Sequence, residues 1–140
     1  MLDVLFKIAI QLRMMQLASH HIHHIVSRAL FFQDHEAFSD FYKQLEDDYD
    51  GVAERIVGFS GSLDIQLLNK EVFQKLNTVQ FNTAENKDLF KQLLILEKEL
   101  CSLCNLLDKS PDTSSGTKQL VGDICNLSEI RQYKIKQRIK

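Results

Sequence analysis

The chain contains almost no residues that break helices. It has one proline, Pro111, and five glycines in 140 residues. An all-β fold needs many turns, and turns use both residue types heavily. The scarcity of both therefore favours long helices and an all-α fold.

Apolar residues recur at three- and four-residue spacing in four long stretches, which predicts four long helices. The first two are expected over residues 2–28 and about 35–59, with a short link between them. The last two are expected over about 86–109 and roughly 113–135, and the break between them contains Pro111. Short links join antiparallel neighbours in helix bundles.

The connection between the second and third helices is much longer than the other two. It covers residues 60–85, and residues 63–76 within it have the spacing of a short amphipathic helix. A connection of this length can return the chain along a bundle. The pattern predicts a ferritin-like four-helix bundle with a short extra helix in the crossover, folded as one domain over residues 1–140.

Composition and charge bear on the cellular setting. The chain is 44% hydrophobic and 26% charged, which is typical of a soluble globular protein. No apolar run reaches the roughly 18 residues that a membrane span needs, and the first helix lacks the layout of a secretory signal. Three cysteines, an odd number, fit a reducing compartment. We therefore expect a cytoplasmic protein without membrane association.

The first predicted helix is apolar on two faces. Besides its main apolar stripe, it carries a second one on the opposite side: Phe6, Ile10, Met14 and Leu17. A helix with two apolar faces is usually buried on both. This is a hint of oligomerisation, although a central helix of a larger domain would show the same pattern.

All five histidines fall within sixteen positions, near the end of the first helix and the start of the second: His20, His21, His23, His24 and His35. Asp50 and Glu54 follow on the second helix, four residues apart and so on one face. Imidazole nitrogen and carboxylate oxygen together suit a cation such as Fe(II) or Zn(II). Helical angles place these residues at the margin of the bundle, where a second subunit could meet them.

The spacing of these residues resembles the signature of the Dps family of mini-ferritins. His23 is followed twelve positions later by His35, in the run HEAF, and Asp50 and Glu54 lie in the run DGVAERI. The short crossover helix is another feature that separates Dps proteins from larger ferritins. The resemblance covers most of the chain, and the third and fourth helices match in pattern and length.

The resemblance implies a ferroxidase site at a twofold interface between subunits. It implies that one subunit supplies His23, Asp50 and Glu54. The partner then supplies His35 and a carboxylate four residues later. These residues would hold iron, with zinc as a substitute at the same site.

This chain departs from the family pattern at two positions. The last carboxylate is replaced by Ser39, a weak neutral ligand, so the second iron position is weakened or lost. Asp40 and Asp47 are near in sequence and could compensate, but Asp40 points about 100° away from Ser39 around the helix. His24 stands where the family usually has tryptophan, and both His24 and His20 are further candidate ligands.

The function implied by the resemblance is oxidation of Fe(II) by hydrogen peroxide or dioxygen. The ferric product would be stored inside a hollow dodecamer, which protects against oxidative damage. Two alternatives stay open. One is a Dps-like structural or DNA-associating shell with a degenerate ferroxidase site, which Ser39 permits. The other is a four-helix regulator or interaction module whose histidine cluster has no role.

Two further features have simpler interpretations. Cys101 and Cys104 lie one turn apart and Cys125 lies on the next helix, and we expect all three to be small buried hydrophobes. The end of the chain is basic, with Arg131, Lys134, Lys136, Arg138 and Lys140. These residues could bind DNA, but they also complement the negative end of the last helix dipole. DNA is therefore the less favoured partner, and the net charge of −2 agrees with this.

Overall fold

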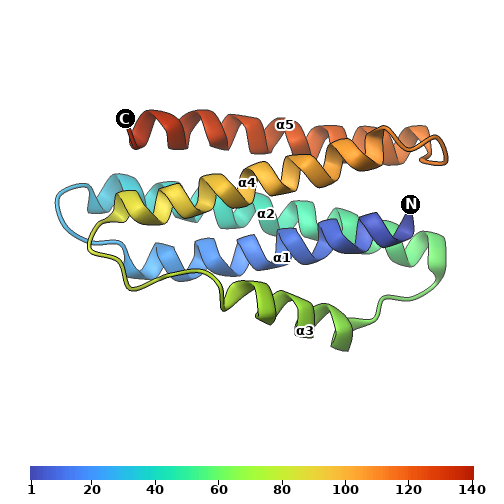
Figure 1. The fold of residues 1–140 in the computed structure, drawn as a ribbon, viewed down its shortest axis with the longest axis horizontal. Helices are drawn as coiled ribbons and strands as arrows, with labels where there is room; N and C mark the ends of the chain where they lie inside the picture. Colours follow the sequence, from blue (N-terminus) through green and yellow to red (C-terminus); the bar gives the residue numbers. More distant parts are fainter.

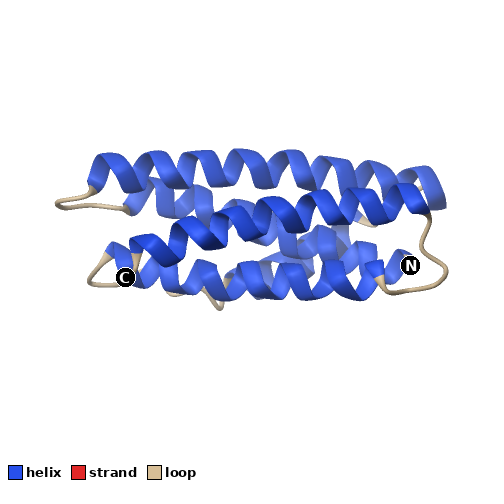
Figure 2. Cartoon of the chain, turned by 90° about the horizontal axis from the view of Figure 1, so that it is seen from above, coloured by secondary structure: helices blue, strands red, loops and turns tan.

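The computed structural model describes all 140 residues, and its regular structure is entirely helical. The helices are α1 (Leu2–Ile25), α2 (Phe31–Ser60), α3 (Ile65–Leu76), α4 (Asn86–Asp108) and α5 (Ser115–Arg138). Figure 2 shows long helices running along one another and no strand. The predicted all-α fold, with a short helix in the crossover, is confirmed.

The helices form two antiparallel hairpins and one outlying element. α1 packs against α2 and α4 packs against α5, while α3 lies against the outer side of α1 (Figure 1). The crossover that contains α3 returns the chain along the bundle, so that α2 and α4 begin at the same end. That end also holds the last turn of α1, which places the histidine-rich segment beside the start of α2.

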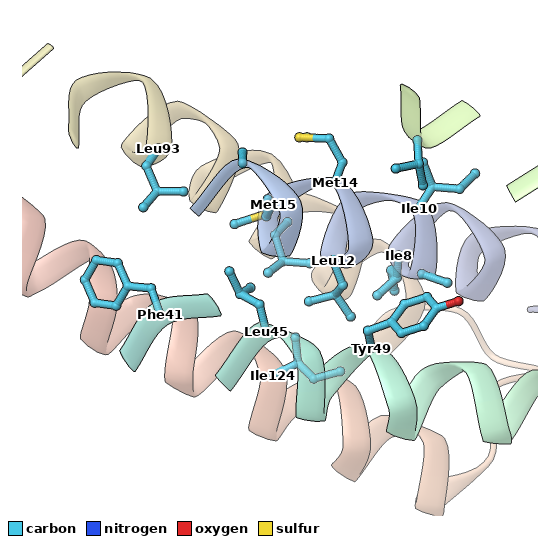
Figure 3. Close-up of a cluster of buried hydrophobic side chains, with 14 of the residues drawn as sticks. Ile8, Ile10, Leu12, Met14, Met15, Phe41, Leu45, Tyr49, Leu93 and Ile124 are labelled. Atoms are coloured by element: carbon cyan, nitrogen blue, oxygen red, sulfur yellow. The ribbon is translucent and has the colours of Figure 1, made fainter. Parts of the chain in front are cut away.

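One apolar core joins the helices. It contains thirty buried residues, and all five helices contribute to it. In Figure 3, Ile8, Leu12 and Met15 of α1 point towards Leu45 and Tyr49 of α2. Each such aliphatic side chain stabilises the fold by about 1.5–3 kcal/mol when fully buried. This packing fixes the rotation of α1 about its axis and hence the direction of its histidines.

The second apolar stripe of α1 is covered in part by the same chain. Ile10 and Met14 are buried, and Figure 3 shows them pointing away from α2. Leu68 and Val72 of α3 are buried as well, and α3 packs on α1. Phe6 and Leu17, at the two ends of the stripe, stay partly exposed.

The link between α1 and α2 differs most from the sequence-based boundaries. α1 ends at Ile25, three residues early, and α2 begins at Phe31, four residues early. Between them Arg28 has φ of 73°, a left-handed conformation that costs a non-glycine residue roughly 1 kcal/mol. The spacing of apolar residues does not indicate where a single residue with a left-handed conformation will end a helix.

No helix of the chain combines the length and the apolar character that crossing a membrane would require.

Candidate metal centre

Two imidazole rings from different helices stack on each other where α1 ends and α2 begins. The ring centroids of His23 and His35 are 3.7 Å apart and the ring planes are 22° from parallel. Nδ1 of His23 lies 2.8 Å from the main-chain oxygen of His35. Nδ1 of His35 lies 2.7 Å from the main-chain oxygen of His23.

This reciprocal bonding fixes the tautomer of both rings. A carbonyl oxygen only accepts, so each Nδ1 carries the proton, and the neutral ring keeps its lone pair on Nε2. Metal-binding histidines are commonly oriented in this way, with the second ring nitrogen donating to a main-chain carbonyl. His23 and His35 are thus prepared to offer two nitrogen ligands from a single chain.

A buried carboxylate anchors the start of α2 next to this pair. Asp34 is 1% exposed and precedes His35. Arg138 of α5 donates two hydrogen bonds to its carboxylate, both of 2.9 Å, and the Asn86 side chain of α4 donates a third of 2.9 Å. Three helices are therefore tied together one residue away from His35.

Two more histidines extend the cluster along α1. The ring of His20 stacks on Tyr42 of α2 at 4.2 Å and lies 4.8 Å from that of His24, which is itself 5.3 Å from His23. Partial burial, and then the neighbouring His24, lower the pKa of His20, which favours its neutral form. His21 points elsewhere and meets Phe81 edge-on at 5.7 Å.

The two expected carboxylates lie far from the imidazoles of the same chain. Asp50 and Glu54 are exposed on α2, fifteen and nineteen residues after His35. At about 1.5 Å per residue these separations are roughly 22 and 28 Å along the helix. Within one chain the structure therefore brings His23 together with His35 and does not bring it to Asp50 and Glu54, which differs from the grouping that the resemblance implies.

The residues that could replace the missing carboxylate are placed differently from one another. Ser39 is half-buried one turn after His35, on the face expected for it. Asp40 lies on another side of α2, where it lines a cavity of about 360 Å³ together with Lys134 and Arg138 of α5. Asp40 is thus directed away from the histidines. Asp47 is exposed and lies roughly three turns after His35 on α2.

A buried polar cluster occupies the centre of the bundle, and the sequence analysis missed it. Arg131, 1% exposed, donates to Glu97 through Nε at 2.6 Å and Nη2 at 3.0 Å. Its Nη1 donates to Gln44 at 3.1 Å, and the Ser128 hydroxyl donates to Glu97. The Asp48 Oδ2 atom has no hydrogen-bond partner, and burial raises the pKa of Asp48 to about 6.

A sequence signal for this cluster did exist. Asp48 falls on the core-facing stripe between Leu45 and Val52, and Glu97 interrupts the leucine stripe of α4. A charged residue at an apolar stripe position indicates a buried partner. Arg131 was interpreted as part of the basic end of the chain, and its burial corrects that interpretation.

Comparison with known proteins supports the resemblance. No family model matches the chain. The curated DNA protection during starvation protein of Helicobacter pylori (strain J99) is 34% identical over 100 residues, which cover 66% of this chain and 67% of that protein.

Two solved structures share the fold. A mutant of Mycobacterium smegmatis Dps1 gives a TM-score of 0.81 at 15% identity, covering 99% of this chain and 94% of that one. The second structure is the Dps protein of Vibrio cholerae O1, which is described as a member of a broad superfamily of ferritin-like diiron-carboxylate proteins. It gives a TM-score of 0.71 at 20% identity, covering 99% of this chain and 88% of that one. The structural matches show the ferritin-like fold, the sequence match shows the family, and the chain therefore belongs to the Dps family.

Proposed function

We propose that this protein is a mini-ferritin that binds and oxidises Fe(II) at a site shared between two copies of the chain and sequesters the ferric product. The observation that carries the proposal is the orientation of His23 and His35. Both rings keep Nε2 free while Nδ1 is bonded to a main-chain carbonyl. Two such nitrogens are suitable ligands for Fe(II).

The remaining ligands are proposed to come from a second copy. Asp50 and Glu54 lie on a strip of α2 that also contains Ser39, by helical spacing. An isologous twofold contact pairs residue i with residue j in both directions, and an axis perpendicular to α2 sets the two copies of this helix antiparallel. The midpoints between His35 and these two acids fall at positions 42 to 45, which is where the axis would cross α2.

Each site would then combine His23 and His35 of one chain with Asp50 and Glu54 of the other. His23, His35 and Glu54 would hold Fe(II), with Asp50 as a further or bridging ligand. Two oxygen and two nitrogen donors leave positions open for an oxidant and for solvent. With peroxide the reaction balances as two Fe(II), one hydrogen peroxide and two protons giving two Fe(III) and two waters.

Ser39 affects how many cations each site holds. A neutral hydroxyl is a poor substitute for a carboxylate, so we propose one firmly bound Fe(II) per site and a weak second position. His20 and His24 are further nitrogen donors beside that position, with His24 exposed. Zn(II) would occupy the same donors without being oxidised and would therefore inhibit.

A cage is the proposed assembly. Twelve copies of the 16.2 kDa chain correspond to about 194 kDa, which sedimentation or light scattering would detect directly. The proposed location is the cytoplasm, in agreement with the three free cysteines.

The test of the shared site is subunit complementation. One variant carries His23→Ala and His35→Ala, the other carries Asp50→Ala and Glu54→Ala, and each alone should lose accelerated Fe(II) oxidation by peroxide. When the two are unfolded together and reassembled at random, half of the dimers are mixed and each has one intact site. About a quarter of wild-type activity should return.

The matched control is His21→Ala, because this histidine is also on α1 but lies outside the cluster. It should keep wild-type activity. Mixtures that stay inactive although mixed particles form would refute the shared site. Wild-type protein that oxidises Fe(II) no faster than the double variants would instead support a shell without ferroxidase activity.

A shell without ferroxidase activity is favoured by one observation: Ser39 stands where the family pattern has a carboxylate. The basic end of the chain gives little support to the proposal that such a shell binds DNA. Arg131 is buried against Glu97 and Arg138 is bonded to Asp34, whereas Lys134, Lys136 and Lys140 are exposed. An electrophoretic shift of DNA at low salt that disappears at moderate salt would measure what these lysines contribute.

A further inference from the structure

Three donor side chains meet between α4 and α5, on helices that carry none of the proposed iron ligands. Cys101 of α4 and Cys125 of α5 bring their Sγ atoms to 3.0 Å, and Oε1 of Glu129 lies 3.7 Å from Sγ of Cys125. One ligand atom from each of the three residues lies within 4.8 Å of the others. The sequence pair Cys101 and Cys104 does not form this cluster, because Cys101 meets Cys125 across the helix interface instead.

These distances are close to those of a tetrahedral thiolate site. Two thiolates that bind Zn(II) at about 2.3 Å lie about 3.8 Å apart, and a thiolate and a carboxylate oxygen lie about 3.6 Å apart. The Cys125 to Glu129 distance already fits. The two sulfur atoms need to separate by less than about 1 Å, which small rotations about their χ1 angles can supply.

The donor atoms of the cluster favour a cation. Two sulfur atoms and one carboxylate oxygen, all of them electron-pair donors, surround the same small space. A soft divalent cation replaces the thiol protons and neutralises the carboxylate at the same time.

An outer partner and an entry path are present as well. The side-chain amide of Gln132 donates to Sγ of Cys101 at 3.5 Å, a contact that stabilises a thiolate. A cavity of about 250 Å³ is lined by Cys125, Glu129 and Cys104 and leads from the surface to the cluster. Solvent in this cavity can supply the fourth ligand.

We propose that Cys101, Cys125 and Glu129 form a second cation site, separate from the histidine cluster, that takes a thiolate-preferring divalent ion such as Zn(II) and links α4 to α5. Because the site joins two helices of one hairpin, it would act on stability and would not need a partner chain for its ligands.

Co(II) is the probe for this site, because thiolate ligation gives an intense ligand-to-metal charge-transfer absorption that imidazole and carboxylate do not. The assembled, reduced, metal-free protein is titrated in a His23→Ala, His35→Ala background, which removes the histidine ligands. We expect one Co(II) per chain with the thiolate absorption. Binding of either Co(II) or Zn(II) to the metal-free protein should release two protons per cation at neutral pH, one from each thiol, and Zn(II) should displace bound Co(II) without further proton release.

Three variants make the assignment specific. Cys125→Ser should abolish the absorption. Glu129→Gln, at an exposed position that leaves the packing intact, should weaken Co(II) binding by at least about tenfold. Cys104→Ala is the matched control, since this cysteine lines the same cavity but is not in the cluster, and it should bind as the parent does.

Absence of the charge-transfer absorption in the reduced His23→Ala, His35→Ala protein, which is the parent of the three variants, would overturn the proposal. So would an unchanged absorption in Cys125→Ser, or an unchanged affinity in Glu129→Gln. None of these outcomes bears on Fe(II) oxidation, because the histidine ligands are absent from the background.

Discussion

His23 and His35 each bond through Nδ1 to the main-chain carbonyl of the other, so two helices hold two imidazoles in one fixed arrangement. The arrangement belongs to one chain, whereas the carboxylates that would complete a metal site lie four to five helical turns away on α2. A site built from these residues therefore requires a second copy of α2 in the opposite direction.

Restoring a carboxylate at position 39 should strengthen the second cation position. Ser39→Asp places an acid one turn after His35, on the same face of α2. In a Cys125→Ser background, which removes the proposed thiolate site, we expect the Zn(II) stoichiometry to rise from one to two per chain, and we expect Fe(II) oxidation to accelerate. Isothermal titration calorimetry and stopped-flow absorbance measure these two effects. Ser39→Asn, of similar size but without charge, is the control, and an equal gain from it would contradict the charge argument.

The buried ion pair should be very sensitive to loss of one partner. Arg131→Met leaves the Glu97 carboxylate buried without its main donor, and removal of one partner of such a pair typically lowers the free energy of unfolding by about 3–5 kcal/mol. Urea denaturation at one fixed protein concentration measures the change. The double variant with Glu97→Met should recover much of the lost stability, since it removes both charges. If the double variant is as unstable as Arg131→Met, packing and not charge explains the loss.

Asp48 should make stability fall as pH rises. Its folded-state pKa is about 6, above the ordinary value of 3.8, mainly because of burial. The folded state then holds a proton that the unfolded state has released between these two values, so the free energy of unfolding decreases as pH increases from about 4 to 6. Arg131, Asp47, Glu97 and Asp123 also act on this carboxyl group.

Asp48→Asn removes this titration without a large change in shape. The variant should be more stable than the wild type at pH 7 by about 1–2 kcal/mol, a value reduced for the partial exposure of the carboxyl group. The advantage should vanish at pH 4, where Asp48 is protonated. Urea midpoints of both proteins across this range provide the measurement, and a pH-independent difference would show that Asp48 does not titrate as stated.

The hydrogen bonds of Asp34, which anchor the start of α2 next to the candidate metal centre, should stabilise the fold. Asp34→Asn keeps the size of the side chain but weakens the bonds to Arg138 and Asn86, and hydrogen bonds to charged groups contribute about 1.5–3 kcal/mol each. We expect a lower melting temperature and faster amide exchange in the first turn of α2. Asp40→Asn, on the same helix but exposed, should change neither, and equal effects in both variants would exclude a specific anchor.

The apolar periodicity of the sequence determined which segments are helical, because helix formation and amphipathicity depend on residues three and four positions apart. It predicted four long helices, the short helix of the crossover and the strip of α2 that contains Asp50 and Glu54. The clustering of the histidines was visible for the same reason, since neighbours in sequence on one helix remain neighbours in space.

Only the tertiary structure decided which faces meet, because the rotation of each helix about its axis is set by the packing of the whole core. Packing joined His23 to His35 in one chain, covered part of the second stripe of α1 with α3 and buried Arg131 against Glu97. It also brought Cys101 to Cys125, twenty-four positions apart, in place of the nearby Cys104. Each of these contacts joins different helices, and local spacing carries no information about the distance between them.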